Sequence, residues 1–302
     1  MSPERVAAEI DGRRINLSNL DKVLYPETGF TKGQMLNYYA EISSVMLPYL
    51  RDRPLTMKRF PDGVQGQAFF EKHAPSHTPD WVGTVAVPSS RGTHEPIDYV
   101  VIGDRAALMW AANLATIEFH VPLWRVSETS DPGRSPDQMV FDLDPGPGTS
   151  IVECCEVARW IRTQLDDDPV YSKTSGSKGL QLYVPLSGID SGEARERAHS
   201  IAMSVERDHP ELAVSNMRKD LRKGKVLIDW SQNHPAKTTV CVYSLRARPE
   251  PTVSTPVDWK EVDTCAKKRD PDLLRFEAPE VLDRVGRLGD LTAGLLSERP
   301  GA

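Results

Sequence analysis

The sequence predicts an α+β fold with a largely antiparallel sheet core flanked by helices. Segments in which apolar residues recur at helical spacing interleave with many short runs of β-branched and aromatic residues. Hydrophobic residues make up 39% and charged residues 26% of the 302 residues, which is typical of a globular protein. The interleaving also allows an α/β arrangement, and the pattern by itself does not separate the two.

The chain shows no internal repeat, no Gly/Ser linker and no clear domain boundary. A chain of this length can form one large domain, so we expect a single domain over residues 1–302. Its core is expected over residues of about 10–248, followed by a Pro-rich and partly helical C-terminal extension over residues 249–302.

Apolar spacing and capping residues predict the helices of the first part of the chain. Thr31 can cap a helix over residues 32–50, and another helix is expected over residues 105–116. A short capped helix is expected to contain Asp21 and Lys22. The β-favouring runs predict strands over residues 10–18, 53–60, 68–72, 97–102 and 117–122.

The second part of the chain continues this alternation. Ser150 can cap a helix over residues 151–165, and further helices are expected over residues 191–207 and 279–288. The predicted strands cover residues 139–143, 171–174, 180–185, 225–230 and 240–244.

Two acids follow each other on the strand that ends in a Pro-Gly turn after residue 144. Side chains alternate along a strand, so Asp142 and Asp144 project from the same face. Their separation of about 7 Å lets two carboxylates bracket a divalent cation. Asp229 lies on another strand-like run, and we expect the three aspartates to meet at one metal site. A solvated strand end is the alternative for the pair, because short acidic motifs often have no function.

A glycine-rich loop, Ser175-Gly-Ser-Lys-Gly179, lies between two predicted strands. Small residues let backbone amides approach an anion, and Lys178 adds a positive charge. The spacing is not that of a Walker A loop, and a plain hairpin turn explains the segment equally well. Lys32 lies at an expected helix N-terminus, where phosphate can bind, although a surface lysine is the simpler explanation.

Two adjacent aromatic residues, Phe69 and Phe70, lie on a predicted strand. Neighbouring side chains on a strand point to opposite faces, so we expect one ring to be exposed, where it can stack on a base. Packing of both rings between two layers is the alternative. His120 ends the strand over residues 117–122, and a lone histidine in that place is more often packed or solvated than catalytic.

Charge and cysteine content narrow the classes of protein. The net charge of −6 excludes a protein whose whole surface is basic. Local basic clusters, such as residues 218–225, can still bind polyanions, or they can simply form a solvated face. The four cysteines form no Cys-x-x-Cys pair, which argues against a zinc ribbon or a thioredoxin-like centre. Neither a transmembrane segment nor an apolar signal core is evident, so we expect no membrane partner and a cytoplasmic location.

Several stretches in the same order resemble the primase-polymerase domain of bacterial non-homologous end-joining DNA ligases, in the archaeo-eukaryotic primase superfamily. The resemblance runs over nearly the whole chain and implies the primase-polymerase fold. The stretches that carry it lie at residues 20–26, 31–32, 57–60, 69–72, 120–122, 140–146, 174–179, 228–233, 237–239 and 243–246.

The resemblance also implies roles for single residues. The metal-binding and catalytic acids are Asp142, Asp144 and Asp229. The residues that contact the incoming nucleotide and its triphosphate are Lys58, His120, Ser175, Lys178, Arg222, Gln232 and Arg246. The residues that hold a DNA 5′-phosphate are Lys22 and Lys32. The aromatic residues near the template strand are Phe69 and Phe70.

The function implied is template-directed nucleotidyl transfer that fills gaps at broken DNA ends, with a preference for ribonucleotides and priming ability left open. The implied cofactors are two Mn²⁺ or Mg²⁺ ions, and the substrates are NTPs or dNTPs. The implied partners are double-stranded DNA with gaps or 3′ overhangs and a 5′-phosphate, together with Ku and a DNA ligase, in the nucleoid of a bacterium. Since the family often fuses this domain to a ligase, a stand-alone homologue and an excised domain both fit the sequence.

Two other classes stay open. A metal-dependent glycosyltransferase can also use an Asp-x-Asp pair, but it leaves Asp229, Lys22 and Lys32 without a role. A non-catalytic DNA-end binding module explains the lysines, but it gains nothing from three acids beside phosphates. Nucleotide incorporation into a primer-template separates both classes from a polymerase.

Overall fold

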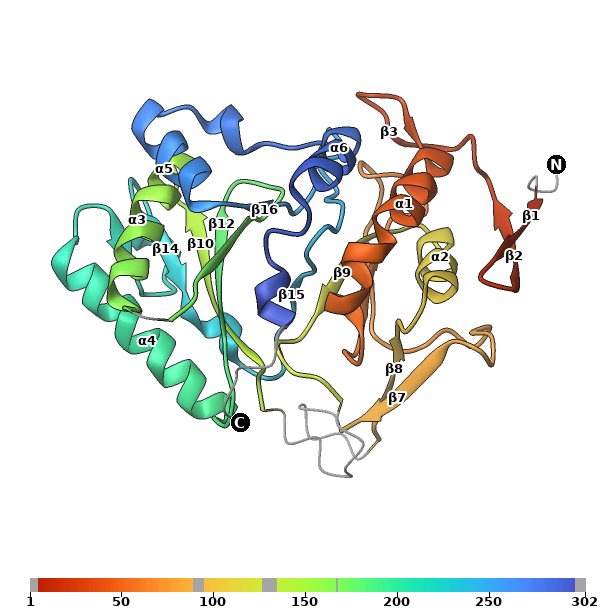
Figure 1. The fold of residues 1–302 in the computed structure, drawn as a ribbon, viewed down its shortest axis with the longest axis horizontal. Helices are drawn as coiled ribbons and strands as arrows, with labels where there is room; N and C mark the ends of the chain where they lie inside the picture. The colour runs from red at the N-terminus through yellow and green to blue at the C-terminus, as the bar shows by residue number, and fades with distance from the viewer. Residues whose placement is uncertain (1–4, 89–94, 127–134, 167, 297–302) are drawn as a thin grey trace.

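The computed structural model describes residues 5–88, 95–126, 135–166 and 168–296. Figure 1 shows the first of these ranges, in red to yellow, on one side of the molecule and the green to blue part mainly on the other. A six-stranded sheet and a four-stranded sheet are the main sheets, and three two-stranded pairs accompany them. The expected α+β class with largely antiparallel sheets is confirmed, because the strands of both main sheets pair antiparallel except at one position.

The six-stranded sheet has the order β13-β14-β10-β12-β11-β16, and its one parallel pair is β13 with β14. Its strands are β10 (Gln138–Pro145), β11 (Tyr171–Thr174), β12 (Leu180–Pro185), β13 (Ala213–Val214), β14 (Val226–Asp229) and β16 (Pro256–Val257). The alternation of β10 turns Phe141 and Leu143 into the core and leaves Asp142 and Asp144 on the other face.

The four-stranded sheet has the order β15-β9-β5-β6, so β6 is an edge strand. Its strands are β5 (Thr56–Arg59), β6 (Phe69–Glu71), β9 (Thr116–Val121) and β15 (Thr239–Val240). The two-stranded pairs join β1 (Arg5–Ile10) to β2 (Arg13–Ser18), β3 (Val23–Tyr25) to β4 (Phe30–Thr31), and β7 (Gly83–Val87) to β8 (Ile97–Val101).

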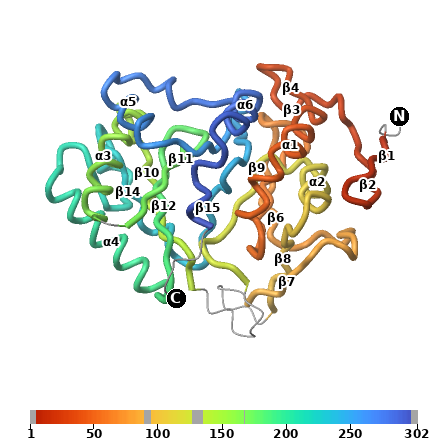
Figure 2. Tube along the Cα trace, viewed as in Figure 1, coloured from red at the N-terminus to blue at the C-terminus, as the bar shows by residue number. Residues whose placement is uncertain are grey.

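Six α-helices occur in the described residues: α1 (Lys32–Leu50), α2 (Arg105–Asn113), α3 (Ile151–Gln164), α4 (Ser191–Asp208), α5 (Trp259–Lys268) and α6 (Ala278–Leu288). At the start of most of these helices a side chain accepts a hydrogen bond from a free backbone amide, and Thr31 and Ser150 form the capping boxes of α1 and α3. Helix α3 packs on β10 and also against α5 (Figure 2). Among the described helices, none is long and apolar enough to cross a membrane.

The N-terminal region differs from the expectation in two ways. The predicted strand over residues 10–18 is the end of a hairpin, because Asp11 and Gly12 take left-handed conformations with φ of 50° and 74° and turn β1 back onto β2. The predicted helix around Asp21 and Lys22 is wrong. Asn19 has a φ of 55° and its carbonyl accepts the amide of Lys22, so the chain makes a turn there.

Two predicted elements also end earlier than expected. Helix α2 stops at Asn113, because Ala115 takes a φ of 62° and turns the chain into β9. The predicted strand over residues 240–244 is wrong beyond Val240. Tyr243 has a φ of 65° and the amide of Ser244 bonds back to the carbonyl of Cys241, which closes a turn instead of extending the ladder.

Candidate functional site

Three aspartates lie together on the six-stranded sheet. Asp142 on β10 is paired directly with Asp229 on β14, so their Cα atoms are about 4.5–5.5 Å apart. Asp144 follows two residues later on β10 and therefore shares the face of Asp142. We call Asp142, Asp144 and Asp229 the acid row. The juxtaposition expected from the sequence is thus present in the strand register.

The acid row has too little positive charge around it. Burial, followed by the negative charge of Asp144, raises the pKa of Asp142 to about 7. Burial and the charge of Asp229 also raise the pKa of Asp144, while Arg222 and Arg246 act in the opposite direction. Carboxylates that repel one another in this way are stabilised in their charged form by a cation between them.

The oxygen ligands of the acid row suit a hard divalent cation, but the three carboxylates do not converge on one position. In the described part of the chain, no three His, Cys, Asp or Glu side chains form a ready-made metal cluster. One oxygen of Asp229 accepts from the amide and hydroxyl of Ser231, and the other accepts from Gln232 at 3.1 Å. Hydrogen bonds therefore occupy Asp229 in this state, and a cation would have to compete with them. An all-oxygen set of this kind suits Mg²⁺ or Mn²⁺.

A second cluster lies on the four-stranded sheet around Glu118, a residue that sequence reasoning missed. Glu118 is 2% exposed and accepts from Lys58 at 3.1 Å and from His120 at 2.8 Å. Arg246 Nε lies 3.4 Å from the same carboxylate, and the amide of Ala247 donates to it at 3.1 Å. We call Glu118, Lys58, His120 and Arg246 the cation cluster. Its members come from β5, β9 and the segment after β15, and Glu118 holds them together.

One carboxylate, Glu118, partly offsets the two fixed positive charges of the cation cluster, Lys58 and Arg246. The hydrogen bond from His120 and the charges of Arg246, His120 and Lys58 outweigh burial and lower the pKa of Glu118. Burial lowers the pKa of His120, despite its bond to Glu118. An ionised Glu118 is an acceptor only, so His120 donates through Nε2 and keeps Nδ1 as an acceptor.

Arg246 connects the cation cluster to the glycine-rich loop. Its guanidinium donates to the carbonyl of Ser175, the first residue of that loop. The loop joins β11 to β12 as a hairpin, which is compatible with either interpretation of the motif. Gly176 has a φ of 65°, and a Cβ there would lie 2.6 Å from the backbone of Val253, which explains the need for glycine.

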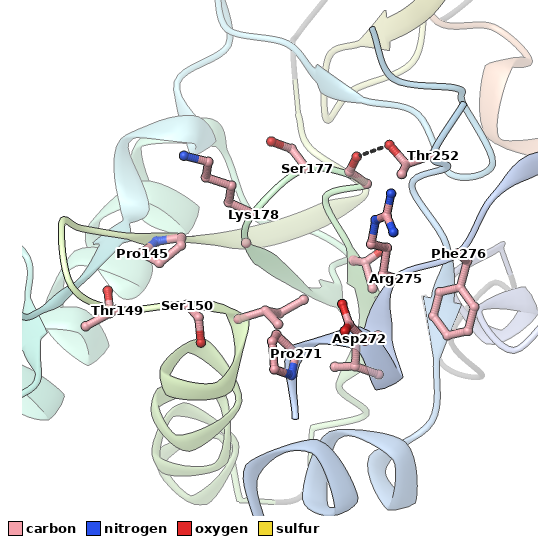
Figure 3. Close-up of a pocket in the computed structure, with 15 residues that line it drawn as sticks. Pro145, Thr149, Ser150, Ser177, Lys178, Thr252, Pro271, Asp272, Arg275 and Phe276 are labelled. Carbon is pink, nitrogen blue, oxygen red and sulfur yellow. Dashed lines mark hydrogen bonds between the residues drawn. The ribbon is translucent and has the colours of Figure 1, made fainter. Parts of the chain in front are cut away.

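The loop does not present its amides to an anion as expected. The hydroxyl of Ser175 accepts from the amides of Ser177 and Gly179, at 3.2 and 3.1 Å. These two donors are therefore engaged within the loop. Lys178 is exposed, and Figure 3 shows its ammonium on the side of the loop away from Pro271 and Asp272. The loop can therefore attract a phosphate through the charge of Lys178 more than through free backbone amides.

A cavity of about 300 Å³ lies next to the loop but does not include the acid row. Figure 3 shows Ser150, at the start of α3, and Pro271 on one side of it, and Thr252 bonded to the loop on the other. Arg222 lies outside this cavity. Its terminal nitrogen donates to the carbonyl of Met217 at 2.6 Å, while its Nε is buried with no partner among the described residues. A buried free donor whose charge acts on Asp144 is suited to an anion.

Lys22 and Lys32, the two lysines assigned to a 5′-phosphate by the resemblance, lie close together. The amide of Lys32 donates to the carbonyl of Lys22 at 2.8 Å, and the charge of Lys22 adds to burial in lowering the pKa of Lys32 to about 8. Lys32 is not the surface lysine considered above, because it is 4% exposed and donates to the carbonyl of Ser18 and to Asn113. Lys22 is more exposed and bridges to Asp62 at 3.1 Å.

Both aromatic rings of β6 are exposed, Phe69 by 47% and Phe70 by 65%. One exposed ring was expected, and the second is exposed as well, because β6 is a three-residue strand at the edge of its sheet. Phe70 lies 6.5 Å from the ring of His120 and 5.4 Å from the ammonium of Lys58. An exposed ring thus adjoins the cation cluster.

Comparisons with known proteins agree with this arrangement. Residues 31–292 match the model of the LigD primase-polymerase domain. The chain is 44% identical over 290 residues to the multifunctional non-homologous end joining protein LigD of Mycolicibacterium smegmatis, covering 95% of this chain and 37% of that protein. It is 31% identical over 280 residues to the bifunctional LigD of Bacillus subtilis, covering 91% of this chain and 43% of that protein. The chain thus spans well under half the length of these relatives.

A solved structure is similar over nearly its full length. The polymerase domain of Mycobacterium tuberculosis ligase D, in complex with DNA, shares 42% identity and a TM-score of 0.87, covering 95% of this chain and 99% of that one. The fold is therefore that of a mixed α+β primase-polymerase domain. The chain belongs to the family of LigD primase-polymerase domains.

Proposed function

We propose that the chain is a template-directed nucleotidyltransferase that fills gaps at broken DNA ends during non-homologous end joining. The observation that carries the proposal is the acid row, in which Asp142 and Asp229 face each other in register beside Asp144. Carboxylates whose pKa values stay raised despite nearby cations are candidates for a functional site, because a bound ligand can use them. Family membership supplies the class of reaction.

Asp142, Asp144 and Asp229 would hold two Mn²⁺ or Mg²⁺ ions. When bound, such ions supply Lewis acidity toward a primer 3′-hydroxyl and neutralise charge on the triphosphate. Gln232 is a neighbour of this set, because it donates to Asp229. It orients that carboxylate and can turn to the nucleotide once a cation takes its place.

The cation cluster would bind the triphosphate and sugar of the incoming nucleotide. Arg246 and Lys58 offer fixed positive charge, to which Lys178 and Arg222 add from the loop and from the segment before β14. The glycine-rich loop and Glu118 hold Arg246 from two sides, which reduces the reorganisation needed when an anion arrives. Phe69 and Phe70 offer exposed faces on which template bases can stack.

We further propose that ribonucleotides are used at least as well as deoxyribonucleotides. His120 keeps Nδ1 as an acceptor, and the hydroxyl of Ser175 already accepts twice and so keeps its proton to donate. A ribose 2′-hydroxyl can both donate and accept, so it complements this pair. Losing such a hydrogen bond costs about 1–3 kcal/mol, or roughly tenfold or more in kcat/KM. Neither side chain is bulky enough to block the 2′ position.

The proposed substrate is double-stranded DNA with a gap or 3′ overhang and a 5′-phosphate, held by Lys22 and Lys32. Ku and a DNA ligase are the proposed partner proteins, and the nucleoid of a bacterial cytoplasm is the proposed location. The similar ligase D polymerase domain was solved with DNA, which supports DNA as the polymer bound.

One assay tests the proposal. The purified chain is incubated with Mn²⁺, a 5′-phosphorylated gapped duplex and either an rNTP or a dNTP, with each of the four template bases in turn. We expect single-nucleotide addition that follows the template base, stops with EDTA, and is at least as fast with the rNTP. His120→Ala and Ser175→Ala should each reduce the rNTP preference.

The same assay separates the other classes. DNA-end binding without incorporation would indicate a binding module. Hydrolysis or transfer from a nucleotide sugar without incorporation would indicate a glycosyltransferase. A strong dNTP preference would contradict the ribose contacts, and an rNTP preference unchanged in both variants would contradict the residues named for them.

A further inference from the structure

A fully buried lysine lies behind the acid row and has no part in the function proposed so far. Lys173 on β11 is 1% exposed. Its ammonium donates to Gln181 at 2.5 Å and to the hydroxyl of Ser254 at 2.7 Å, and it lies 5.4 Å from the centre of the Tyr183 ring. Placing an ammonium group in such a site is unfavourable, so its three neighbours must compensate for lost hydration.

The strand register places this lysine in line with the acid row. Lys173 on β11 pairs with Gln181 on β12, and Gln181 pairs with Asp142 on β10. Asp142 in turn pairs with Asp229 on β14. Directly opposed residues present their side chains on the same face of a sheet, so the four side chains form one continuous line across four strands.

The hydrogen bonds of Gln181 fix the orientation of its amide group. Its oxygen accepts from Lys173 at 2.5 Å and from the hydroxyl of Tyr183 at 3.2 Å. Two donors use both lone pairs of an amide oxygen, and a flipped amide would set its NH₂ group against the ammonium of Lys173. The NH₂ group must therefore point away from Lys173, toward Asp142. From there it can donate to Asp142, and it acts to lower the pKa of that carboxyl against the larger, raising effects of burial and Asp144.

We propose that Lys173 is a positioning residue for metal binding, which acts through Gln181 to hold the carboxylate of Asp142 toward the other aspartates. This inference rests on the proposed metal site. Groups that hydrogen-bond to a metal-binding side chain fix its orientation, and their loss usually weakens metal affinity by about 10–100-fold.

Mn²⁺ binding to the full chain, without DNA or nucleotide, tests the inference. Free Mn²⁺ is measured by electron paramagnetic resonance during titration of the wild type, Asp142→Asn, Lys173→Met and Gln181→Met. Methionine matches the length of both side chains and removes their polar ends. We expect Lys173→Met and Gln181→Met each to bind Mn²⁺ about 10–100-fold more weakly. The double variant should be no weaker than the poorer single one, because both act through one hydrogen-bonded line.

Arg284→Met is the matched control. Arg284 is also a buried cation, 8% exposed, and its partners are the carbonyl of Pro256 and Glu261 rather than any member of the acid row. The Arg284→Met substitution should lower the thermal unfolding temperature of the metal-free protein without changing its affinity for Mn²⁺. A purely structural Lys173 would behave in the same way as this control.

The possible results distinguish a failure of the proposed metal site from a failure of the positioning role of Lys173. If the wild type and Asp142→Asn bind Mn²⁺ equally, the proposed metal site is wrong. If Asp142→Asn loses Mn²⁺ while Lys173→Met and Gln181→Met keep wild-type affinity, only the positioning role is wrong. If Lys173→Met does not fold, Gln181→Met decides, because it breaks the same line and leaves the lysine bonded to Ser254.

Discussion

The acid row and the cation cluster differ in how far other side chains of the protein compensate their charges. In the cation cluster, Glu118 lies among Lys58, His120 and Arg246, and its charge partly offsets theirs. In the acid row, burial and the charges of neighbouring aspartates raise the pKa values of Asp142 and Asp144, and the hydrogen-bond partners of Asp229 are neutral. One region gathers cations around a carboxylate, whereas the other gathers carboxylates that, in the proposed function, would hold divalent cations.

This difference indicates a division of labour between the two main sheets. A cluster held by a buried carboxylate keeps its shape before the substrate arrives, which lowers the cost of binding a triphosphate. A row of repelling acids has its lowest energy only when a divalent cation is bound. Arg246 joins the two regions, because it contacts Glu118 and the glycine-rich loop and its charge also acts on Asp144.

Removing a member of the acid row should have the largest effect. Asp142→Asn keeps the size of the side chain but removes a negative charge, so we expect nucleotide addition to fall by about a thousandfold or more, equivalent to about 4 kcal/mol. Single-nucleotide insertion in Mn²⁺ is the measurement. Binding to a DNA end, measured in parallel, should survive. Near-normal insertion would show that the acid row does not hold a catalytic metal.

Removing the centre of the cation cluster should destabilise the fold. Glu118→Gln leaves the partly buried Lys58 and Arg246 without a counter-charge, and the loss should approach the roughly 3–5 kcal/mol of a broken buried ion pair. Urea unfolding measures the loss, and the KM for the nucleotide should rise as well. The control is Glu250→Gln, which breaks an exposed pair with Arg275 and should cost about 0–1 kcal/mol. Equal losses in the two variants would contradict the central role of Glu118.

The lysine pair should contribute a smaller, ligand-dependent effect. Replacing Lys22 and Lys32 by alanine removes charge-assisted bonds to a 5′-phosphate, worth about 1.5–3 kcal/mol, so the preference for phosphorylated over hydroxyl ends should fall tenfold or more. The salt dependence of DNA binding should weaken by about one unit of slope per lysine. Lys22→Ala alone is the cleaner variant, because Lys32 also bonds to Ser18 and Asn113 inside the protein. An unchanged preference in the double variant would mean that the lysines only support the fold.

The smallest effect is the pH dependence of the metal-free protein. The pKa of Asp142 is raised to about 7, so the folded state keeps a proton that the unfolded chain loses near pH 4. The free energy of unfolding should therefore fall as pH rises from 5 to 7, by about 1–2 kcal/mol more than in Asp142→Asn. Chemical unfolding in EDTA at the two pH values gives this difference. A wild-type slope equal to that of the variant would mean that Asp142 titrates normally.

The sequence predicted the parts of this arrangement that depend on local patterns. The period-2 alternation of β10 placed Asp142 and Asp144 on one face, and capping residues located the starts of α1 and α3. The turns at Asn19, Ala115 and Tyr243 were missed, because a residue other than glycine with a positive φ leaves little trace in a single sequence. The single-domain organisation and the limits of its core stay predictions.

The centre of the cation cluster could not be predicted for a different reason. Glu118 lies between apolar neighbours on β9, in a run that reads as an ordinary strand. Its three side-chain partners come from positions 58, 120 and 246, and only the pairing of β5 with β9 and the turn after β15 bring them together. A buried acid in an otherwise apolar strand is the one available signal, and it predicts a polar partner without saying which.

The most direct test of this division of labour is a crystal structure of the chain with Mn²⁺ and a non-hydrolysable ribonucleoside triphosphate, with data collected for Mn anomalous scattering. The account predicts anomalous peaks within about 2.3 Å of carboxylate oxygens of Asp142, Asp144 and Asp229, with the triphosphate on Arg246, Lys58 and Lys178. Mn²⁺ peaks away from these aspartates, or a nucleotide in the cavity between the glycine-rich loop and α3, would contradict it.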